Sequence, residues 1–376
     1  MSTIDLSFMD GVQYAERGII TQADLVTSTA DGVDLNDLRN EFQEAIDLVN
    51  KDRLAIAELF TFNTTNAVDY LVSGSTGVEF EEATEFGEPG SGRPSEPVGD
   101  PLGYPFKWWD SAKRYTWRFL QDATAEDLRH IHNAFLDADN RNQYRHIMNA
   151  LFGNTNRTYQ GVPVYSLYNG TDGKTPPTFA GTSFDSGHSH YLVSGAAVID
   201  PTDVETLIET VEEHGHGRVV GDTMVILASK TEAKVISTFR AGSNGASYDF
   251  VASDTSIPYL TTQTLVGSRP GGSFHGLKVI GSYGGALIVE DFHVPAGYVV
   301  SLASAGPGSG RNPLAFREHP RAELRGLVQI PGDNARYPLV DSYLSRGFGV
   351  GVRHRGAAAV MQVKATGSYV PPTLVF

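Results

Sequence analysis

The chain has no cysteine among its 376 residues. Disulfide bonds and zinc sites with thiolate ligands are therefore excluded. No run approaches the roughly 18 consecutive apolar residues that a membrane-spanning helix needs, so none is expected. The opening MSTIDLSFMDG also lacks the basic region and apolar core of a secretory signal. We therefore expect a soluble chain that is made in the cytoplasm.

Basic residues are scarce in the first quarter of the chain. Residues 1–100 hold 20 Asp and Glu against 5 Lys and Arg, whereas the other 276 residues hold 24 of each sign. The net charge of -15 therefore comes from this quarter alone. It is either a solvated acidic surface or one that attracts basic patches of another copy. The acidic excess argues against tight binding to nucleic acid, although it allows proximity to DNA.

Histidines at alternate positions are the only pattern that suggests a metal site. Two such pairs occur, with a possible carboxylate ligand beside the second pair: His188 and His190, then His214 and His216, with Glu212 or Glu213. Pairs of this kind in loops are weak indicators of a metal, and we expect loop histidines with no bound ion. His130 and His132 are weaker candidates still, because side chains two residues apart on a helix point in different directions.

Signatures of catalysis are missing as well. The glycine-rich run Ser304–Gly310 lacks the lysine and the serine or threonine of a phosphate-binding loop. The segment GTSFDSGHSH contains Ser, Asp and His, but not the strand-turn-helix context that presents a nucleophilic serine. We expect no catalytic residues, no cofactor and no enzyme activity.

A long helix is predicted from Thr124 to Phe152. Its apolar residues recur at spacings of three and four, the period of one helical face: Leu128, Ile131, Phe135, Ile147, Met148 and Leu151. Thr124 can cap the first turn, and Gly153 offers a stop. Such a helix would be about 42 Å long. The apolar stripe lapses near Asp139–Gln143, so a break there remains open.

Just before this helix the sequence indicates an extended hairpin. Gly77–Phe86 is acidic and Lys113–Phe119 is basic, and both alternate as strands do, so we pair them around a tip at Gly87–Gly103. A two-stranded ribbon cannot bury the rings of Trp108, Trp109 and Trp117 by itself. It must lie on the rest of the chain or, more plausibly, on a neighbouring copy.

The remaining segments indicate a mixed α/β unit. Helices are expected over 34–50, 200–214 and 230–239, with Asp34, Asp200 and Ser229 as caps. Strands are expected over 161–168, 222–228, 277–280, 286–289 and 298–303, whereas 54–62 could be either. The C-terminal run 337–364 would form one or two strands, in which small residues allow close packing. That run also carries Arg346, Arg353 and Arg355.

Three segments carry a resemblance to a known family. They are SRGFGVGVRHRGAAAVMQV (345–363), ALIVEDFHVPAGYVVSLAS (286–304) and NPLAFREHP (312–320). Together they resemble the major capsid proteins of tailed bacteriophages, particularly phages of actinobacteria. The order of elements fits that family over nearly the whole chain. These motifs are not catalytic signatures, so the match is one of overall pattern.

The resemblance implies an α+β fold of the Hong Kong ninety-seven capsid type. Its parts would be an N-terminal arm (1–33), an N-terminal helical part of the peripheral domain (34–76), an extended hairpin loop (77–120), a peripheral domain (121–190) with a spine helix (124–152), an axial domain (191–336), and a returning strand with a C-terminal tail (337–376).

The implied function is structural. Such a chain assembles into hexamers and pentamers of an icosahedral shell around double-stranded DNA, in the host cytoplasm, and ends in the virion. Its partners would be other copies of itself, portal and scaffolding proteins and optionally decoration proteins, with no tight specific DNA binding and no membrane. Because only about 33 residues precede the first helix, we expect a separate scaffolding protein.

Contacts between copies are expected at one set of residues: Glu79, Glu81, Glu82, Trp108, Trp109, Trp117, Arg346, Arg353 and Arg355. Some relatives join subunits through an isopeptide bond from a lysine in the hairpin loop. The tip at 87–103 holds Arg93 but no lysine, and the nearest lysine is Lys107. We therefore expect a non-covalent shell. The alternatives are an encapsulin-type compartment, which shares the fold, and a metal-dependent hydrolase that uses the paired histidines.

Overall fold

A computed structural model describes the chain at residues 26–51, 55–72, 99–112, 115–218, 221–255, 269–332, 338–340 and 342–374. The chain divides into two compact units. The smaller comprises 1–49, 110–136 and 329–345, and the larger comprises 50–109, 137–328 and 346–376. Neither unit is a continuous stretch of sequence, so both are built by residues far apart along the chain.

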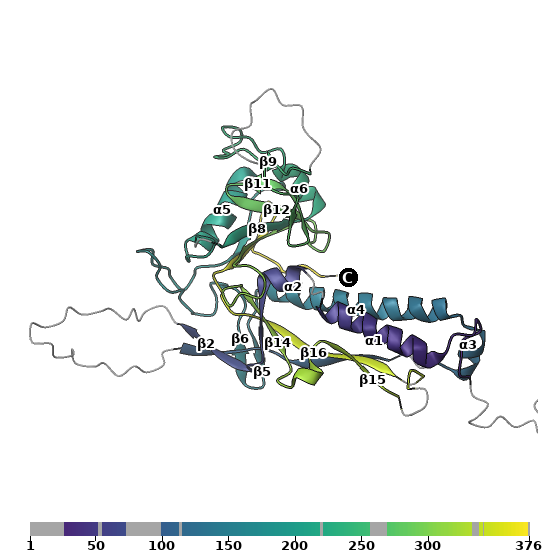
Figure 1. Cartoon of the computed structure of the whole chain (residues 1–376). Coiled ribbons are helices and arrows are strands. Elements are labelled where there is room, and N and C mark those ends of the chain that lie inside the picture. The colour runs from purple at the N-terminus through teal and green to yellow at the C-terminus, as the bar shows by residue number, and fades with distance from the viewer. Residues whose placement is uncertain are drawn as a thin grey trace, which may run out of the picture. The chain divides into compact units, whose positions relative to one another are not determined.

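Two helices form the centre of the smaller unit. Helix α1 (Leu35–Lys51) runs beside the start of α4 (Ala125–Phe152), as Figure 1 shows. The Phe42 ring stacks on His132 with 4.2 Å between ring centroids, and Arg129 Nε lies 2.8 Å from Glu41 Oε1. One buried apolar cluster of this unit consists of Leu35, Leu38, Phe42, Tyr115, Leu120, Ala125, Leu128 and Leu339. The helix expected over 34–50 is thereby confirmed.

The start of α4 is fixed by side chains that bind its free amides. The Asp127 amide donates to Thr124 Oγ1 at 3.3 Å, and the Thr124 amide donates to Asp127 Oδ2 at 2.9 Å. The Ala125 amide donates to Asp31 Oδ1 at 3.0 Å. These bonds satisfy donors that have no partner within the helix. Thr124 therefore acts as the cap that the sequence predicts.

Helix α4 continues without interruption for 28 residues. The break that the sequence leaves open at Asp139–Gln143 does not occur. Gln143 Nε2 donates to Asp139 Oδ2 at 2.9 Å, one turn away, and Arg346 pairs with the same carboxylate. Because these polar groups are buried and paired, they replace the missing apolar contacts of the stripe.

An eight-stranded sheet dominates the larger unit. Its order is β10-β11-β12-β8-β13-β17-β7, and β9 pairs with β11. The bounds are β7 Tyr191–Val193, β8 Thr223–Ala228, β9 Val251–Ala252, β10 Ser273–Phe274, β11 Leu277–Tyr283, β12 Ala286–Glu290, β13 Tyr298–Ser304 and β17 Ala358–Gln362. The strands expected over 222–228, 277–280, 286–289 and 298–303 are confirmed.

Both faces of this sheet are buried. On one face Met224 and Ile226 of β8 pack with residues of α5 (Pro201–Glu212) and α6 (Lys230–Ile236), which lie over the sheet in Figure 1. On the other face Val225 and Leu227 pack with α2 (Ala55–Phe60) and the last turns of α4. The caps Asp200 and Ser229 accept hydrogen bonds from first-turn amides, as expected.

A second sheet and two hairpins complete the strands. The sheet has the order β1-β14-β16-β15, and β4 also pairs with β16. Its bounds are β1 Thr61–Thr64, β4 Lys107–Ala112, β14 Leu314–Glu318, β15 Leu327–Ile330 and β16 Tyr343–Val352, with a short 3-10 helix at Ala322–Leu324. The antiparallel hairpins are β2 (Val68–Val72) with β3 (Gly99–Gly103), and β5 (Arg157–Tyr159) with β6 (Val162–Val164). Of segment 54–62, residues 55–60 are helix and 61–62 are strand.

Two sequence-based predictions need correction. The strand expected over Lys113–Phe119 is wrong, because α3 occupies Trp117–Asp122 and Thr116 caps it by accepting from the Phe119 amide at 3.2 Å. The short helix buries Leu120 and leaves Phe119 exposed. The strand expected over 161–168 is limited to Val162–Val164. The acidic arm Gly77–Phe86 lies outside the described residues.

Strand β16 presents a face of glycines to the segment Tyr104–Phe106. A Cβ atom at Gly349 would lie 1.7 Å from the Pro105 carbonyl oxygen, and one at Gly351 would lie 2.9 Å from the Tyr104 ring. Alternate residues of a strand share one face, so this close approach depends on the spacing of the glycines. None of the helices in the described part of the chain is long and apolar enough to cross a membrane.

We expect Gly349→Ala to lower the free energy of unfolding by about 1–3 kcal/mol, because the added methyl must push Pro105 away from the strand. Gly310→Ala is the matched control, since a Cβ there meets nothing within 4 Å. Its stability should stay within about 1 kcal/mol of the wild type. Urea unfolding of the purified chain measures both. Equal stability of the two variants would contradict the steric explanation.

Candidate functional site

Arg355 lies at the centre of a buried polar network in the larger unit. Its Nη2 is 2.6 Å from Asp172 Oδ2, and its Nε donates to the Ser166 carbonyl at 2.8 Å. The guanidinium also lies over the ring of Tyr168, 4.4 Å from its centroid. Only 1% of the Arg355 side chain is exposed. This combination of ion pair, hydrogen bonds and ring contact compensates the loss of water around the charge.

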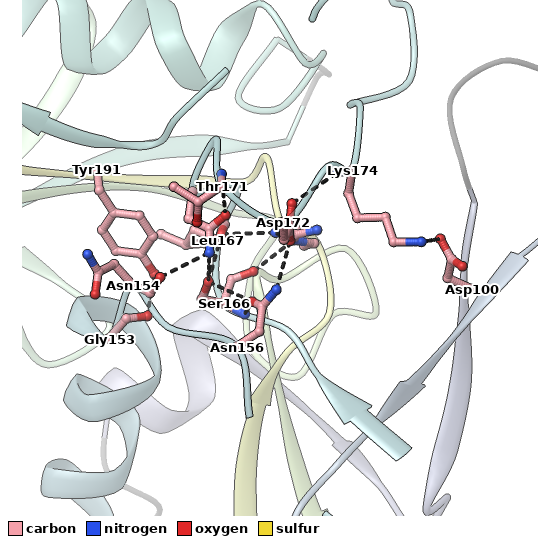
Figure 2. A network of polar contacts seen from close by, with 12 residues as sticks. Asp100, Gly153, Asn154, Asn156, Ser166, Leu167, Thr171, Asp172, Lys174 and Tyr191 are labelled. Carbon is pink, nitrogen blue, oxygen red and sulfur yellow. Dashed lines mark hydrogen bonds and ion pairs between the residues drawn. The ribbon is translucent and has the colours of Figure 1, made fainter. Parts of the chain in front are cut away.

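Asp172 holds the network together from the loop side (Figure 2). It accepts from Asn156 Nδ2 at 2.8 Å and from the Lys174 amide at 3.0 Å. Burial by itself raises the pKa of the Asp172 carboxyl, but the hydrogen bonds and Arg355 outweigh it, and the pKa is lowered. Lys174 in turn pairs with Asp100 Oδ2 at 2.5 Å. The loop after β6 is therefore fixed by charge.

Arg346 forms a second buried ion pair. Its Nε lies 2.9 Å from Asp139 Oδ1 and its Nη2 lies 2.8 Å from Oδ2, a two-pronged contact in which each side chain is 8% exposed. Burial raises the pKa of the Asp139 carboxyl, and Arg346 opposes that rise. The pair joins β16 to the middle of α4 within the larger unit.

The third arginine, Arg353, is more accessible. Its Nε lies 2.8 Å from Asp69 Oδ2 with about a quarter of its side chain exposed. Asp69 belongs to β2, and Tyr104 after β3 donates to the same carboxylate at 3.4 Å. Arg353 therefore connects the end of β16 to the base of the β2–β3 hairpin.

The tryptophans and glutamates expected at contacts between copies lie in different surroundings. Trp108 is 44% exposed and stands edge-on to Phe106. Trp109 packs on His146 and Phe348 instead. Trp117 begins α3, and the three glutamates Glu79, Glu81 and Glu82 lie outside the described residues. Of the tryptophans, Trp108 alone combines a described side chain with large exposure.

Three histidines meet in the larger unit. The Nε2 atoms of His188, His190 and His214 are separated by 3.2, 3.0 and 3.0 Å. His190 is fully buried, and its Nδ1 lies 2.7 Å from the Ala358 carbonyl oxygen. Among the described residues this is the one group of histidine or carboxylate side chains placed to share a metal ion. All three lie in loops or turns, as the sequence predicts, but their meeting in space is not predicted by it.

The pairing in the sequence does not match the grouping in space. One histidine of the second pair joins the first pair, while His216 lies beside His354 with 5.8 Å between ring centroids. Glu212 pairs with Arg218 and is not part of the group. The spacing alone could flag these histidines, but only the folding of the 169–190 loop against the end of α5 brings them together. His130 is exposed on α4.

Burial makes the three imidazoles poor bases. It lowers the pKa of His190 well below its usual range and that of His214 to about 3. Burial also lowers the pKa of His188, and nearby acidic groups oppose the shift. The rings are therefore neutral near pH 7, which is the form that binds metals.

Comparison with solved structures finds a phage chain, a capsid chain and an encapsulin. A chain of Mycobacterium phage Patience is 41% identical, with a TM-score of 0.69, over 96% of this chain and 97% of that one. A capsid chain of a native GTA particle is 13% identical over 84% of this chain and 92% of that one, with a TM-score of 0.46. The SrpI encapsulin of Synechococcus elongatus is 12% identical over 88% and 98%, with a TM-score of 0.44. No family model and no curated protein matches the sequence.

The match to the mycobacteriophage chain extends over nearly the full length of both chains at substantial identity. The chain therefore belongs to the family of major capsid proteins of tailed bacteriophages, as its sequence motifs indicate. Its mixture of helices and sheets is that of the Hong Kong ninety-seven type of capsid protein.

We expect Asp172→Ala to destabilise the chain by about 3–5 kcal/mol, because it leaves the buried Arg355 guanidinium without its counter-ion. The control is Glu323→Ala, which removes an ion pair with Arg321 whose side chains are 69% and 60% exposed. That change should cost far less stability, because exposed ion pairs contribute little. Urea unfolding measures both, and similar losses would argue against a structural role for the network.

Proposed function

We propose that the chain is the shell subunit of a tailed phage, assembling into hexamers and pentamers of an icosahedral capsid around double-stranded DNA. The single observation that supports this is the 41% identity to the Mycobacterium phage Patience chain over 96% of this chain. Portal, scaffolding and optionally decoration proteins are the further partners of this proposal. The role is structural, and the chain is part of the virion.

In this proposal the segments of the chain are assigned to domains by the family pattern. The arm is 1–33, the peripheral domain takes 34–76 and 121–190 with α4 as its spine, the extended loop is 77–120, the axial domain is 191–336, and 337–376 returns to the peripheral domain. The β2–β3 pairing supports the loop, because Val72 lies opposite Gly99 and holds the ends of the intervening segment side by side. The helix α3 shortens the part of 77–120 that can be extended ribbon.

The contacts between copies use two kinds of residue in this proposal. Trp108 and Arg353 have exposed surface that a neighbouring copy can cover, and aromatic and arginine side chains are enriched in such interfaces. Arg346 and Arg355 act from inside, since their buried ion pairs fix the strand and loop positions that the neighbour meets. Glu79, Glu81 and Glu82 would supply negative charge to the same contacts.

The proposal is tested by expressing the full chain and imaging it by negative-stain microscopy. We expect closed shells or rings of capsomers. Boiling the same particles in SDS should release a single band at the mass of one chain, because the loop tip at 87–103 offers Arg93 but no lysine for an isopeptide bond. A chain that stays monomeric at every concentration would contradict the function. A ladder of boiled multimers would contradict only the non-covalent contact.

We expect charge reversal of Glu79, Glu81 and Glu82 to lysine to lower the yield of particles. The loss should be larger at low salt, where attraction between opposite charges is least screened. The control reverses three exposed acidic residues outside that segment, Asp122, Asp137 and Glu209, which changes the net charge equally. Particle yield from sedimentation compares the two. Equal yields would show that these glutamates do not contribute a specific attraction.

A further inference from the structure

The three meeting histidines cannot satisfy one another by hydrogen bonds. Each neutral imidazole Nε2 carries either one hydrogen or one lone pair. With three nitrogens and two states, at least two of them must be alike. At least one of the three close contacts then brings lone pair to lone pair or hydrogen to hydrogen. A triangle of Nε2 atoms with sides of 3.0 to 3.2 Å therefore needs something else between them.

The hydrogen bond of His190 indicates that the missing partner is one that binds a nitrogen lone pair. Its Nδ1 lies 2.7 Å from the Ala358 carbonyl oxygen, which can only accept, so Nδ1 carries the hydrogen. Its Nε2 then holds a lone pair that points toward the other two rings. An outer hydrogen bond to a backbone carbonyl is also how metal-binding histidines are usually oriented.

The separations fit a single small cation. A tetrahedral zinc ion with Zn–N distances of 2.0–2.1 Å places two ligand nitrogens about 3.3 Å apart. The three measured separations lie within about 0.3 Å of that value. Imidazole ligands favour zinc, copper and nickel, whereas magnesium and calcium favour oxygen ligands.

The surroundings hold the rings in place before any ion arrives. The His190 amide donates to the Tyr168 carbonyl at 2.7 Å, and the Val360 amide donates to the His190 carbonyl at 2.8 Å. Phe184 stacks on the His214 ring with 4.1 Å between centroids. A Cβ atom at Gly356 would lie 2.8 Å from His214 Cγ, so the ring fits closely against the backbone.

We propose that the Nε2 atoms of His188, His190 and His214 bind one divalent transition-metal ion of the zinc class. The ion ties the 169–190 loop to the segment that follows α5, and His190 Nδ1 bonds the Ala358 carbonyl of strand β17. Three protein ligands leave a fourth coordination position for water. In a chain without cysteine, such an ion is a cross-link that the sequence can still build.

The test uses the full chain without a polyhistidine tag. The chain is stripped with a chelator, supplied with zinc alone and separated from free ion, and its metal content is measured by mass spectrometry. We expect one zinc ion for each chain and a thermal midpoint that rises with zinc concentration. X-ray absorption of the zinc-loaded wild type should show three histidine ligands. The wild-type measurements depend on no variant.

Variants then place the ion. His188→Ala removes one of the two half-buried ligands and should weaken zinc binding by more than the roughly 10- to 100-fold that loss of an outer-shell partner costs. His130→Ala is the matched control, because that histidine is 76% exposed on α4 and should bind zinc as the wild type does. Circular dichroism checks that both variants fold.

Three results would overturn the proposal. The first is a wild type that retains no stoichiometric zinc after separation from free ion. The second is zinc bound by oxygen ligands alone, with no histidine nitrogen in the absorption spectrum. The third is a folded His188→Ala variant that keeps the affinity of the wild type. None of these measurements requires particles, so failure of the metal site and failure of the capsid proposal are distinguishable.

Discussion

The larger unit depends on one constraint, which is that its central sheet is covered on both faces. Along β8 the side chains alternate between the face under α5 and α6 and the face under α2 and the end of α4. Every residue of β13 is buried for the same reason. A sheet covered on both faces leaves few positions for water, so polar groups near it must find partners within the protein. Hydrophobic burial thus dictates where charges can lie.

The buried arginines follow from this constraint. Arg355 and Arg346 stand at opposite ends of a run of small and apolar residues, and each has a carboxylate within hydrogen-bond distance. A buried pair of this kind is a weak source of net stability, yet removing one partner is costly. The pairs therefore act mainly to specify where the strand and loop lie. The glycines of β16 have a related effect, because their lack of side chains lets the backbone at Pro105 lie against the strand.

Local signals in the sequence predict much of the fold. The caps Thr124, Asp200 and Ser229 and the helical spacing after them give the starts of three helices, because capping and periodicity are properties of neighbouring residues. The buried strands β8, β12 and β13 are found for the same reason. By contrast, Lys113–Phe119 alternates as a strand does, yet Thr116 caps the helix α3, which begins at Trp117. Short segments with large rings do not distinguish the two structures by pattern.

The partners of the charged groups cannot be predicted in this way. Nothing near Arg355 in the sequence points to Asp172, 183 positions earlier, or to the carbonyl groups beside it. The meeting of the three histidines cannot be predicted from the sequence either, since His214 follows the helix α5 and the other two lie in a loop. Pattern identifies the residue types, whereas tertiary contacts decide which of them meet. This is why the arginines expected at contacts between copies include two that lie inside the subunit.

The loop from Asn169 to His190 shows how such contacts replace secondary structure. A stretch of this length without helices or strands is uncommon in a compact domain unless something fixes it. Arg355 and Asp172 hold its beginning. At its end, His190 is bound through its amide, its carbonyl and its ring nitrogen to neighbouring backbone. Since the chain has no cysteine to close a loop covalently, polar side chains perform that task at both ends, and the loop keeps a defined path beside β17.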